Sequence, residues 1–218
     1  STQRSTLFPY TTLFRSCVFD YSRGLALEQV DGGVLEDITI SNITMRDVQN
    51  APVFIRLGAR LRRPATTEPG TVRRILIDNL VAHNVAPHHG LFIAGLPGHP
   101  VEDVVFANIQ IHYAGGGTAE QAARELPELP KAYPDPDVFG ELPSWGLFAR
   151  HVKNLTLRGV ELRVVTPDAR PAMHVEDAQG ARFTDTVISG ADREARWVLR
   201  DVTDLHVRDV TGLADTTR

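Results

Sequence analysis

The sequence predicts an all-β fold, a right-handed parallel β-helix in which the chain winds through stacked coils. A short pattern recurs along the chain: an aliphatic residue, two polar residues, then alternating aliphatic residues that end near Asn or Asp. Its copies begin at Leu35, Val72, Val101, Val152 and Val202. Each copy has the period of two that is typical of a β-strand, and the copies recur at the spacing of one or two coils. Stacked parallel strands explain both features.

Residues 1–16 are set apart, because Thr6–Ser16 matches the in-frame translation of a sequencing adapter. Pro9 and Arg15 interrupt what would otherwise be the apolar run of a secretory signal. We therefore expect residues 1–16 to be non-native, the β-helix to occupy 17–212 with a loop insertion at 115–145, and 213–218 to form a tail. In this interpretation the β-helix is incomplete at its N-terminal end, and the parent protein begins upstream of Cys17.

The composition argues against several classes of function. The 218 residues hold 23 Lys and Arg against 27 Asp and Glu, so the chain lacks the basic excess of nucleic-acid-binding proteins. No apolar run approaches the roughly 18 residues of a membrane span. The single cysteine excludes an internal disulfide, and the eight histidines have no spacing typical of a metal site. We expect a monomer with no nucleic acid, membrane, metal or cofactor as partner.

A second short strand precedes each copy of the repeat. Successive side chains of a strand point to opposite faces, so alternate residues of these strands point into the solenoid and the others point outward. The expected inward residues are Leu25, Leu27, Val53, Ile55, Leu91, Ile93, Leu147, Ala149, Met173 and Val175. Burial of each aliphatic side chain is worth about 1.5–3 kcal/mol, and a slip of one residue would expose the whole set, so the register is fixed. One outward column then reads Glu28, Arg56, Ala94, Arg150, Glu176 and Arg200, and the other reads Ala26, Phe54, Phe92, Phe148, His174 and Val198.

The two outward columns offer one residue per coil, about every 4.8 Å, to an extended ligand. Arginine suits carboxylates and aromatic rings suit the apolar faces of sugars, so the columns predict a groove for an acidic polysaccharide. Two other interpretations stay open. The phenylalanines are buried beneath an insertion, or the arginines Arg56 and Arg150 are surface charges paired with Glu28 or Glu176.

Asn42, Asn79 and Asn108 end the same strand in successive copies of the repeat, at a place where the chain must turn. Asparagine tolerates the left-handed conformation, and Gly159 and Asp209 fill the equivalent place. We expect these residues to be structural and to form an internal hydrogen-bonded ladder.

The segment 115–145 breaks the repeat pattern, with several prolines, a short helical stretch near 119–125, and the aromatic residues Tyr133 and Trp145. Long loops on a rigid scaffold commonly carry function. Because this loop returns directly into the strand with Phe148 and Arg150, we expect it to lie beside or over the outward columns.

Several segments together resemble a known family. They are Arg23–Glu28, Asp31–Gly33, Ile38–Met45, Tyr133-Pro134, Phe139-Gly140, Leu142-Pro143 and Trp145–Leu147. From Cys17 to about Asp209, the chain resembles the C-terminal half of bacterial glycoside hydrolase family 28, which contains polygalacturonases and rhamnogalacturonan hydrolases on a right-handed parallel β-helix.

The resemblance implies a pectin-degrading enzyme, secreted or periplasmic, that hydrolyses galacturonan or rhamnogalacturonan with inversion and binds an acidic plant cell-wall polysaccharide. The family's catalytic aspartates would precede Cys17, so we expect no catalytic residue here and an inactive chain. The family's Arg-Ile-Lys motif falls on Ala26-Leu27-Glu28, which lacks both cations. The candidate substrate-binding residues are Glu28, Arg56, Phe92, Tyr133, Trp145, Phe148 and Arg150.

The spacing of carboxylates also argues against catalysis by this chain alone. Glycosidases need a carboxyl pair about 5–5.5 Å apart for retention or roughly 6.5–9.5 Å apart for inversion. Glu28 and Glu176 stand four coils apart in their column, on the order of 19 Å. Two other functions stay open: another β-helical enzyme acting on uronate polymers, a lyase or an epimerase, or a non-catalytic carbohydrate-binding solenoid.

Overall fold

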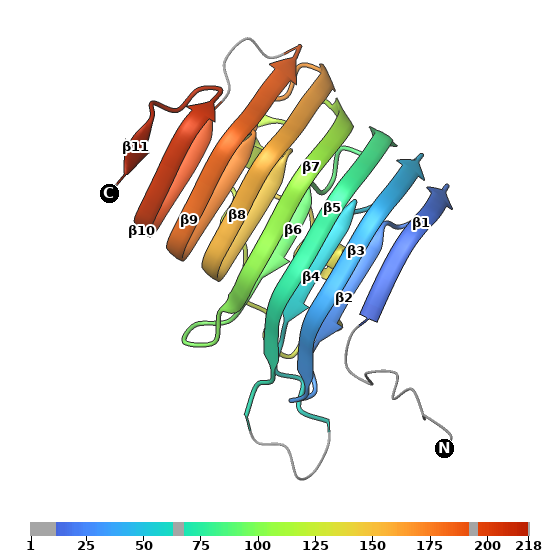
Figure 1. Cartoon of the computed structure of the whole chain (residues 1–218), viewed down its shortest axis with the longest axis vertical. Coiled ribbons are helices and arrows are strands. Elements are labelled where there is room, and N and C mark those ends of the chain that lie inside the picture. Colours follow the sequence, from blue (N-terminus) through green and yellow to red (C-terminus); the bar gives the residue numbers. More distant parts are fainter. Residues whose placement is uncertain (1–11, 63–67, 192–195, 218) are drawn as a thin grey trace, which may run out of the picture.

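The computed structural model describes residues 12–62, 68–191 and 196–217 and confirms the predicted parallel β-helix (Figure 1). The strands are β1 (Thr12–Asp20), β2 (Leu25–Gln29), β3 (Val34–Arg46), β4 (Val53–Leu57), β5 (Thr71–Val85), β6 (Leu91–Ala94), β7 (Val101–Gly115), β8 (Leu147–Thr166), β9 (Met173–Gly190), β10 (Trp197–Val210) and β11 (Thr216–Thr217). The helices are α1 (Ala119–Ala122) and the 3-10 helix η1 (Pro136–Phe139).

Each coil of the solenoid is called a rung here. The strand pairs β2–β3, β4–β5 and β6–β7 form successive rungs, and β8, β9 and β10 then form one rung each. The later strands cross a corner without interruption because a single residue turns the chain there. His151, Asp177 and Asp201 are these residues, with φ of 52°, 47° and 51°. Their stacking follows from the register of β8, β9 and β10.

The interior is an aliphatic core that runs the length of the solenoid. The predicted inward residues Leu27, Val53, Ile55, Leu91, Ile93, Leu147, Ala149, Met173 and Val175 all belong to it, and Leu25 packs against it partly buried. The inward assignment is therefore confirmed. Because every rung contributes to one continuous core, the rungs hold one another in register.

The turn residues Asn42, Asn79, Asn108, Gly159 and Asp209 are all left-handed, with φ between 54° and 62°. They stack as predicted, but within the described part of the chain only one of the expected bonds joins two asparagines. Nδ2 of Asn79 donates to Oδ1 of Asn42 at 3.3 Å, whereas Nδ2 of Asn108 donates to Oδ1 of Asp78 at 2.9 Å. The ladder is exposed, however, so the expected internal position is wrong. The buried residue that follows each turn, such as Ile43 or Leu80, fills the interior instead.

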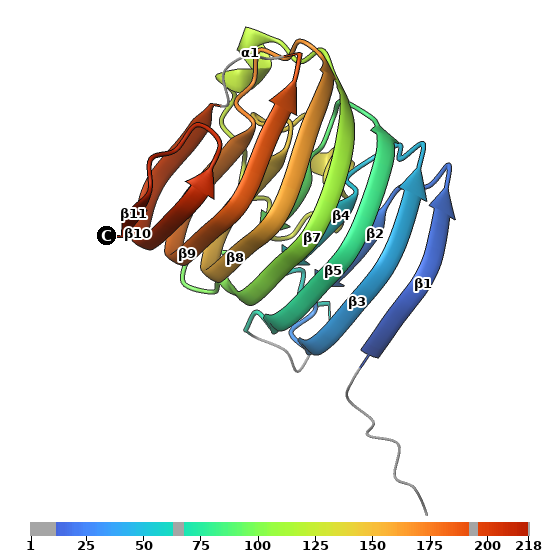
Figure 2. The same ribbon diagram turned by 45° about the horizontal axis from the view of Figure 1, so that its top comes forward.

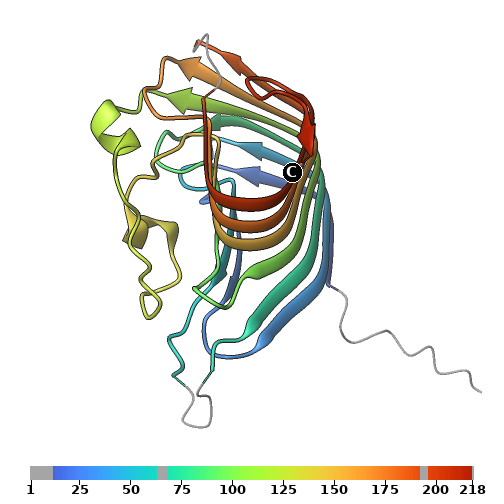
Figure 3. The same ribbon diagram turned by 90° about the vertical axis from the view of Figure 1, so that its left-hand side faces the viewer.

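Residues 116–146, between β7 and β8, are called the insertion here. Figure 3 looks along the solenoid and shows the insertion lying alongside the stacked rungs, and Figure 2 shows α1 at the top of the view. The helix α1 begins with a capping box, in which Oγ1 of Thr118 accepts from the Gln121 amide and Oε1 of Gln121 accepts from the Thr118 amide. It ends at Ala122, earlier than the expected stretch near 119–125.

A buried ion pair fixes the ends of the insertion to the solenoid. Nη2 of Arg170 lies 2.7 Å from Oδ2 of Asp168, and both side chains have almost no exposed surface. The same Asp168 oxygen accepts from the Gly117 amide at 2.9 Å, and Nη1 of Arg170 donates to the Leu142 carbonyl at 3.3 Å. The first and last parts of the insertion are thus held by one buried group.

Paired strands extend on both sides of the range 17–212 expected for the β-helix. The strand β1 begins at Thr12, inside the range expected to be non-native, and pairs with β3 through Thr12↔Ile38 and Cys17↔Ile43. In the expected tail, β11 pairs antiparallel with β10 through Val207↔Thr216. Sheet pairing uses backbone groups, which every sequence supplies, so pairing alone gives no information about the origin of a segment. Residues 1–11 lie outside the described part of the chain.

Candidate functional site

The candidate site lies on one face of the solenoid, formed by β2, β4, β6 and the starts of β8, β9 and β10. We call it the covered face. Its register confirms the two predicted outward columns: Glu28 pairs with Arg56, Arg56 with Ala94, Ala94 with Arg150, Arg150 with Glu176, and Glu176 with Arg200. The aromatic column follows the same pairing. The face is not an open trough, because the insertion lies on it.

The phenylalanines of the covered face are packed beneath the insertion. Phe54, Phe92 and Phe148 are each at most 1% exposed and form a second apolar cluster with Phe139 and Leu142 of the insertion. The ring centroid of Phe92 lies 5.1 Å from that of Phe139 and 5.7 Å from that of Phe148. The packing interpretation therefore holds. Phe92 has no surface to offer a sugar ring, which corrects the expectation of substrate contact.

Arg56 holds the insertion rather than facing solvent. It is 2% exposed, and its Nη2 donates to the carbonyl oxygens of Glu128 and Leu129 at 2.9 and 3.1 Å. Its guanidinium carbon lies 4.9 Å from the centroid of Phe139. Burial, together with the charge of Arg150, lowers the pKa of Arg56 to about 10. Both expectations for Arg56, a surface pair with Glu28 and a contact with substrate, give way to this anchoring role.

Arg150 joins the insertion to the rim of the covered face. Its Nη1 donates to the Leu126 carbonyl at 2.7 Å, and its Nη2 donates to the Pro127 carbonyl at 3.0 Å. The same Nη1 lies 3.2 Å from Oε1 of Glu128 and 3.6 Å from Oε1 of Glu176. The pairing with Glu176 was one of the open interpretations. Although Arg150 is 6% exposed, it still borders a pocket.

Trp145 and Tyr133, both in the insertion, have opposite environments. Trp145 is 2% exposed and packs in the solenoid core, with its ring centroid 5.6 Å from that of Tyr113. It is therefore a core residue and not a sugar platform, because the insertion re-enters the solenoid at that point. Tyr133 is 64% exposed, and the guanidinium carbon of Arg60 lies 5.3 Å from its ring centroid. Tyr133 remains available to a ligand.

Glu28 occupies the first rung of the covered face and is partly buried. Burial, together with the nearby charge of Asp135, raises the pKa of Glu28 to about 6. Asp135 is held in place by Arg23, whose Nη2 donates to it at 2.8 Å and to Asp137 at 2.7 Å. Glu28 is therefore partly protonated near neutral pH and can donate as well as accept a hydrogen bond.

A polar pocket of about 190 Å³ opens where the insertion ends over the last rungs. It is lined by Arg124, Glu125, Leu126, Pro143, Phe148, Arg150, His174, Glu176 and Arg200. We call it the rim pocket. Arg124 is fixed by its bonds to the Glu141 and Phe139 carbonyls at 2.8 and 2.6 Å, whereas Arg200 is exposed. The pocket thus combines positioned and free guanidinium groups.

His174 and Glu176 form the floor of the rim pocket. Nε2 of His174 lies 3.0 Å from Oε2 of Glu176. This hydrogen bond is the main cause that lowers the pKa of Glu176; burial acts in the opposite direction, and the charges of Arg150 and Arg200 assist the lowering. Glu176 is therefore a carboxylate near neutral pH. It can accept a hydrogen bond from a sugar hydroxyl but cannot serve as a general acid.

His151, the residue after Arg150, makes polar contacts that the sequence analysis did not predict. His151 occupies a left-handed corner, with its Nδ1 2.5 Å from Oδ2 of Asp177 and its Nε2 3.0 Å from Oε1 of Glu128. Glu128 thus meets both His151 and Arg150. Neither Glu128 nor Arg124 could be assigned from the repeat pattern, because the insertion that carries them has no repeat. The outward columns did point to His174, Glu176 and Arg200.

Comparisons of the chain with protein-family models, curated proteins and solved structures gave no match. The resemblance to glycoside hydrolase family 28 therefore stays a prediction from the sequence. In residues 12–62, 68–191 and 196–217, no group of three or more His, Cys, Asp and Glu side chains is placed to hold a metal ion. Across the same residues, no helix is long and apolar enough to cross a membrane.

Proposed function

We propose that this chain is the C-terminal, glycan-binding part of a pectin-degrading glycoside hydrolase that acts on galacturonan or rhamnogalacturonan with inversion. One observation carries the proposal: Arg124, Arg150 and Arg200 converge on a pocket that also presents His174 and Glu176. The family resemblance supplies the substrate class, and the pocket supplies chemistry that suits it.

The rim pocket suits a uronate residue for two reasons. Guanidinium groups bind carboxylates through charge-assisted hydrogen bonds, and Arg200 is exposed and free to do so. The carboxylate of Glu176 can accept from the hydroxyl groups of the same sugar, since its pKa is lowered. Phe148 at the pocket wall is buried, so its ring has no surface on which a sugar ring could stack. The pocket would therefore recognise a sugar mainly through charge and hydrogen bonds.

The two carboxylates that the strands of this face carry cannot act together as a hydrolytic pair. Glu28 and Glu176 are four rungs apart in the confirmed register, on the order of 19 Å. That separation exceeds the roughly 6.5–9.5 Å of an inverting pair. In the proposed parent enzyme the acid and base precede Cys17, as the resemblance implies. This chain then positions the polymer and releases no reducing sugar by itself.

A second candidate is an eliminative enzyme on the same polymers, favoured by the position of His174. In β-elimination a base removes the proton next to the uronate carboxylate while a cation neutralises that carboxylate, and the glycosidic oxygen leaves. His174 is hydrogen-bonded to Glu176 and shares the rim pocket with Arg150 and Arg200. Unsaturated product ends, seen by their ultraviolet absorbance and lost in His174→Ala, would favour this candidate over hydrolysis.

The test is binding by the whole chain to a galacturonate oligosaccharide and to the galactose oligosaccharide of the same length, measured by calorimetry. Arg200→Ala should weaken binding of the acidic sugar about tenfold, the effect of one charge-assisted hydrogen bond of about 1.4 kcal/mol, and leave the neutral sugar unchanged. Arg208→Ala, on the same strand and 68% exposed, is the matched control. Equal loss for both sugars would contradict uronate recognition, and sugar binding without turnover by a longer protein would favour a non-catalytic solenoid.

A further inference from the structure

A basic stripe crosses the solenoid away from the covered face. It consists of Arg46 on β3, His83 on β5, His112 on β7 and Arg163 on β8, one residue from each of four successive rungs. Arg46 pairs with His83 and His112 with Arg163 in the register of the strands. The rings of His83 and His112 lie 5.7 Å apart, centroid to centroid, which joins the two halves.

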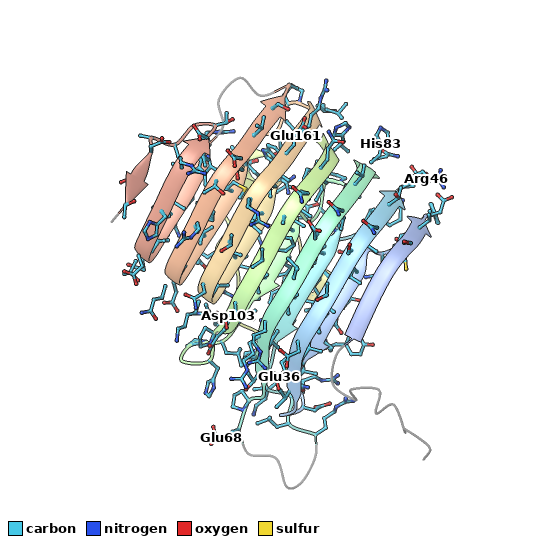
Figure 4. The ribbon with its side chains drawn as sticks, in the orientation of Figure 1. Glu36, Arg46, Glu68, His83, Asp103 and Glu161 are labelled. Carbon is cyan, nitrogen blue, oxygen red and sulfur yellow. The ribbon has the colours of Figure 1, made fainter. Side chains whose placement is uncertain are left out.

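The stripe points outward because the neighbouring positions point inward. Met45, Ala82, Ile111 and Leu162 precede its members by one residue, and all of them are buried in the core. Arg46, His83 and Arg163 are exposed and His112 is partly buried. Figure 4 shows the side chains of Arg46 and His83 beside each other at the ends of β3 and β5.

Most of the stripe has no partner within the described residues. His83, His112 and Arg163 make no hydrogen bond or ion pair there, and Arg46 has only a long contact of 3.5 Å with Asp20, both side chains being exposed. Beside His112 and Arg163 the surface is hollowed by a depression of about 600 Å³ that also touches Val165 and Ser189. His112 and Arg163, which line this depression, are therefore available to a ligand.

We propose that this stripe binds a linear acidic polysaccharide whose chain runs along the solenoid axis. The rung spacing of about 4.8 Å is close to the advance of one pyranose residue, so successive sugar residues can meet successive members of the stripe, with the cations Arg46 and Arg163 at its two ends. Its length, three rung steps, is on the order of 14 Å. The choice of a uronate polymer rests on the proposed function, whereas the stripe itself rests on the register and on its lack of partners.

The surroundings of the stripe favour a glycan over single-stranded nucleic acid. Proteins that bind single strands present aromatic side chains on which bases stack. The adjacent outward column holds Thr44, Val81, Gln110 and Glu161 instead, and Gln110 donates to Glu161 at 3.0 Å. Hydroxyl, amide and carboxylate groups of this kind suit sugar hydroxyls.

The experiment measures binding of the whole chain to de-esterified polygalacturonate on a sensor surface, with fully methyl-esterified polymer as the neutral comparison. Arg46→Ser combined with Arg163→Ser should weaken binding roughly fivefold for each charge removed, with a smaller salt dependence. Arg158→Ser combined with Arg182→Ser removes as many exposed charges from the neighbouring face and is the matched control. Circular dichroism checks that all variants stay folded.

Three outcomes would contradict the proposed role of the stripe: an equal loss of polygalacturonate binding in both double variants, unchanged binding in the stripe variant, or tighter binding of single-stranded DNA than of polygalacturonate. The pocket and the stripe are separable. Arg200→Ala should affect short acidic oligosaccharides without changing the response of the polymer to the stripe substitutions. If only Arg200→Ala has an effect, the stripe fails while the proposed function stands.

Discussion

His151 at a corner of β8 lies 3.0 Å, through Nε2, from Oε1 of Glu128 in the insertion. Its Nδ1 lies 2.5 Å from Oδ2 of Asp177 on the next rung. The imidazole therefore connects the stacked corners to the segment that covers the candidate site. Arg150, the preceding residue, meets the same Glu128 oxygen at 3.2 Å. Two adjacent residues of one strand thus fix the insertion above the rim pocket.

Replacing His151 with asparagine should loosen this connection without straining the backbone. Asparagine tolerates the left-handed φ of 52° that this corner requires, but it is too short to reach Glu128. We expect proteolysis within residues 119–142 to become several-fold faster, with a loss of roughly 1 kcal/mol in local stability. Asp177→Asn, which leaves the contact with Glu128 intact, is the control. If proteolysis becomes equally faster in both variants, His151 stabilises the insertion through its contact with Asp177 and not through Glu128.

Phe92→Ala distinguishes packing from sugar binding. Phe92 is fully buried between β4, β8 and the insertion, so its truncation should cost about 3–5 kcal/mol in the free energy of unfolding. Tyr133→Ala, at a side chain that is 64% exposed, should change stability by less than about 0.5 kcal/mol. Urea unfolding measures both. A stable Phe92→Ala variant with impaired sugar binding would restore the role expected from the sequence.

Arg56→Ala should destabilise the covered face by about 2 kcal/mol, because the carbonyls of Glu128 and Leu129 lose a charged donor in a buried place. Arg56→Met keeps most of the volume and so isolates the loss of hydrogen bonds from the effect of a cavity. Arg158→Ala, at an exposed arginine, is the control. Chemical denaturation followed by circular dichroism measures the change. If Arg56→Met is as stable as the unaltered chain, the two hydrogen bonds of Arg56 make no net contribution to the free energy of unfolding.

Glu28 should make the chain less stable as the pH rises. Burial raises its pKa from 4.5 to about 6, so the folded chain holds more protons than the unfolded chain between these values. Stability is therefore lost as the pH rises through this window, by at most about 1 kcal/mol once solvent screening is considered. Glu28→Gln removes the titration.

The measurement for Glu28 compares the free energy of unfolding of the two chains at several pH values. The advantage of Glu28→Gln should grow from about pH 4.5 to about pH 6 and then stay constant. Carboxylates with lowered pKa, such as Asp31 and Asp137, contribute the opposite trend, but both chains share them and the difference cancels. An advantage that is constant across the range would show that burial does not raise the pKa of Glu28.

The fold was predictable because its main determinant repeats. The alternation of aliphatic residues in β2, β4 and β6 placed Val53, Ile55 and Leu91 in the core, and the structure confirms each one. The outward register followed from the same rule. Alternation gives only the direction of a side chain, however. Whether Phe92 or Arg56 then meets solvent or another segment depends on the insertion, whose sequence has no repeat.

Only the residues that the solenoid strands contribute to the candidate site were predictable from the sequence. His174, Glu176 and Arg200 belong to the outward columns, so register alone brings them together on β9 and β10. Arg124 and Glu128 reach the same site from the insertion through tertiary contacts with Phe139 and Arg150. Local sequence does not encode those contacts. The exposed asparagine ladder shows a similar limit, because the left-handed turn was predictable but the side on which its side chains lie was not.

Asn79→Ala tests the physical reason for that ladder. Asn79 has a φ of 54° and is exposed, so its truncation removes little packing. Alanine pays roughly 1–2 kcal/mol for the left-handed conformation, whereas glycine adopts it freely. We expect Asn79→Ala to lower the free energy of unfolding by about 1 kcal/mol and Asn79→Gly to lower it less. The bond to Asn42 at 3.3 Å is lost in both variants, so the difference between them reports the strain of alanine in this conformation, offset by the greater freedom of glycine in the unfolded chain. Equal losses would instead assign the role of Asn79 to its side-chain hydrogen bond.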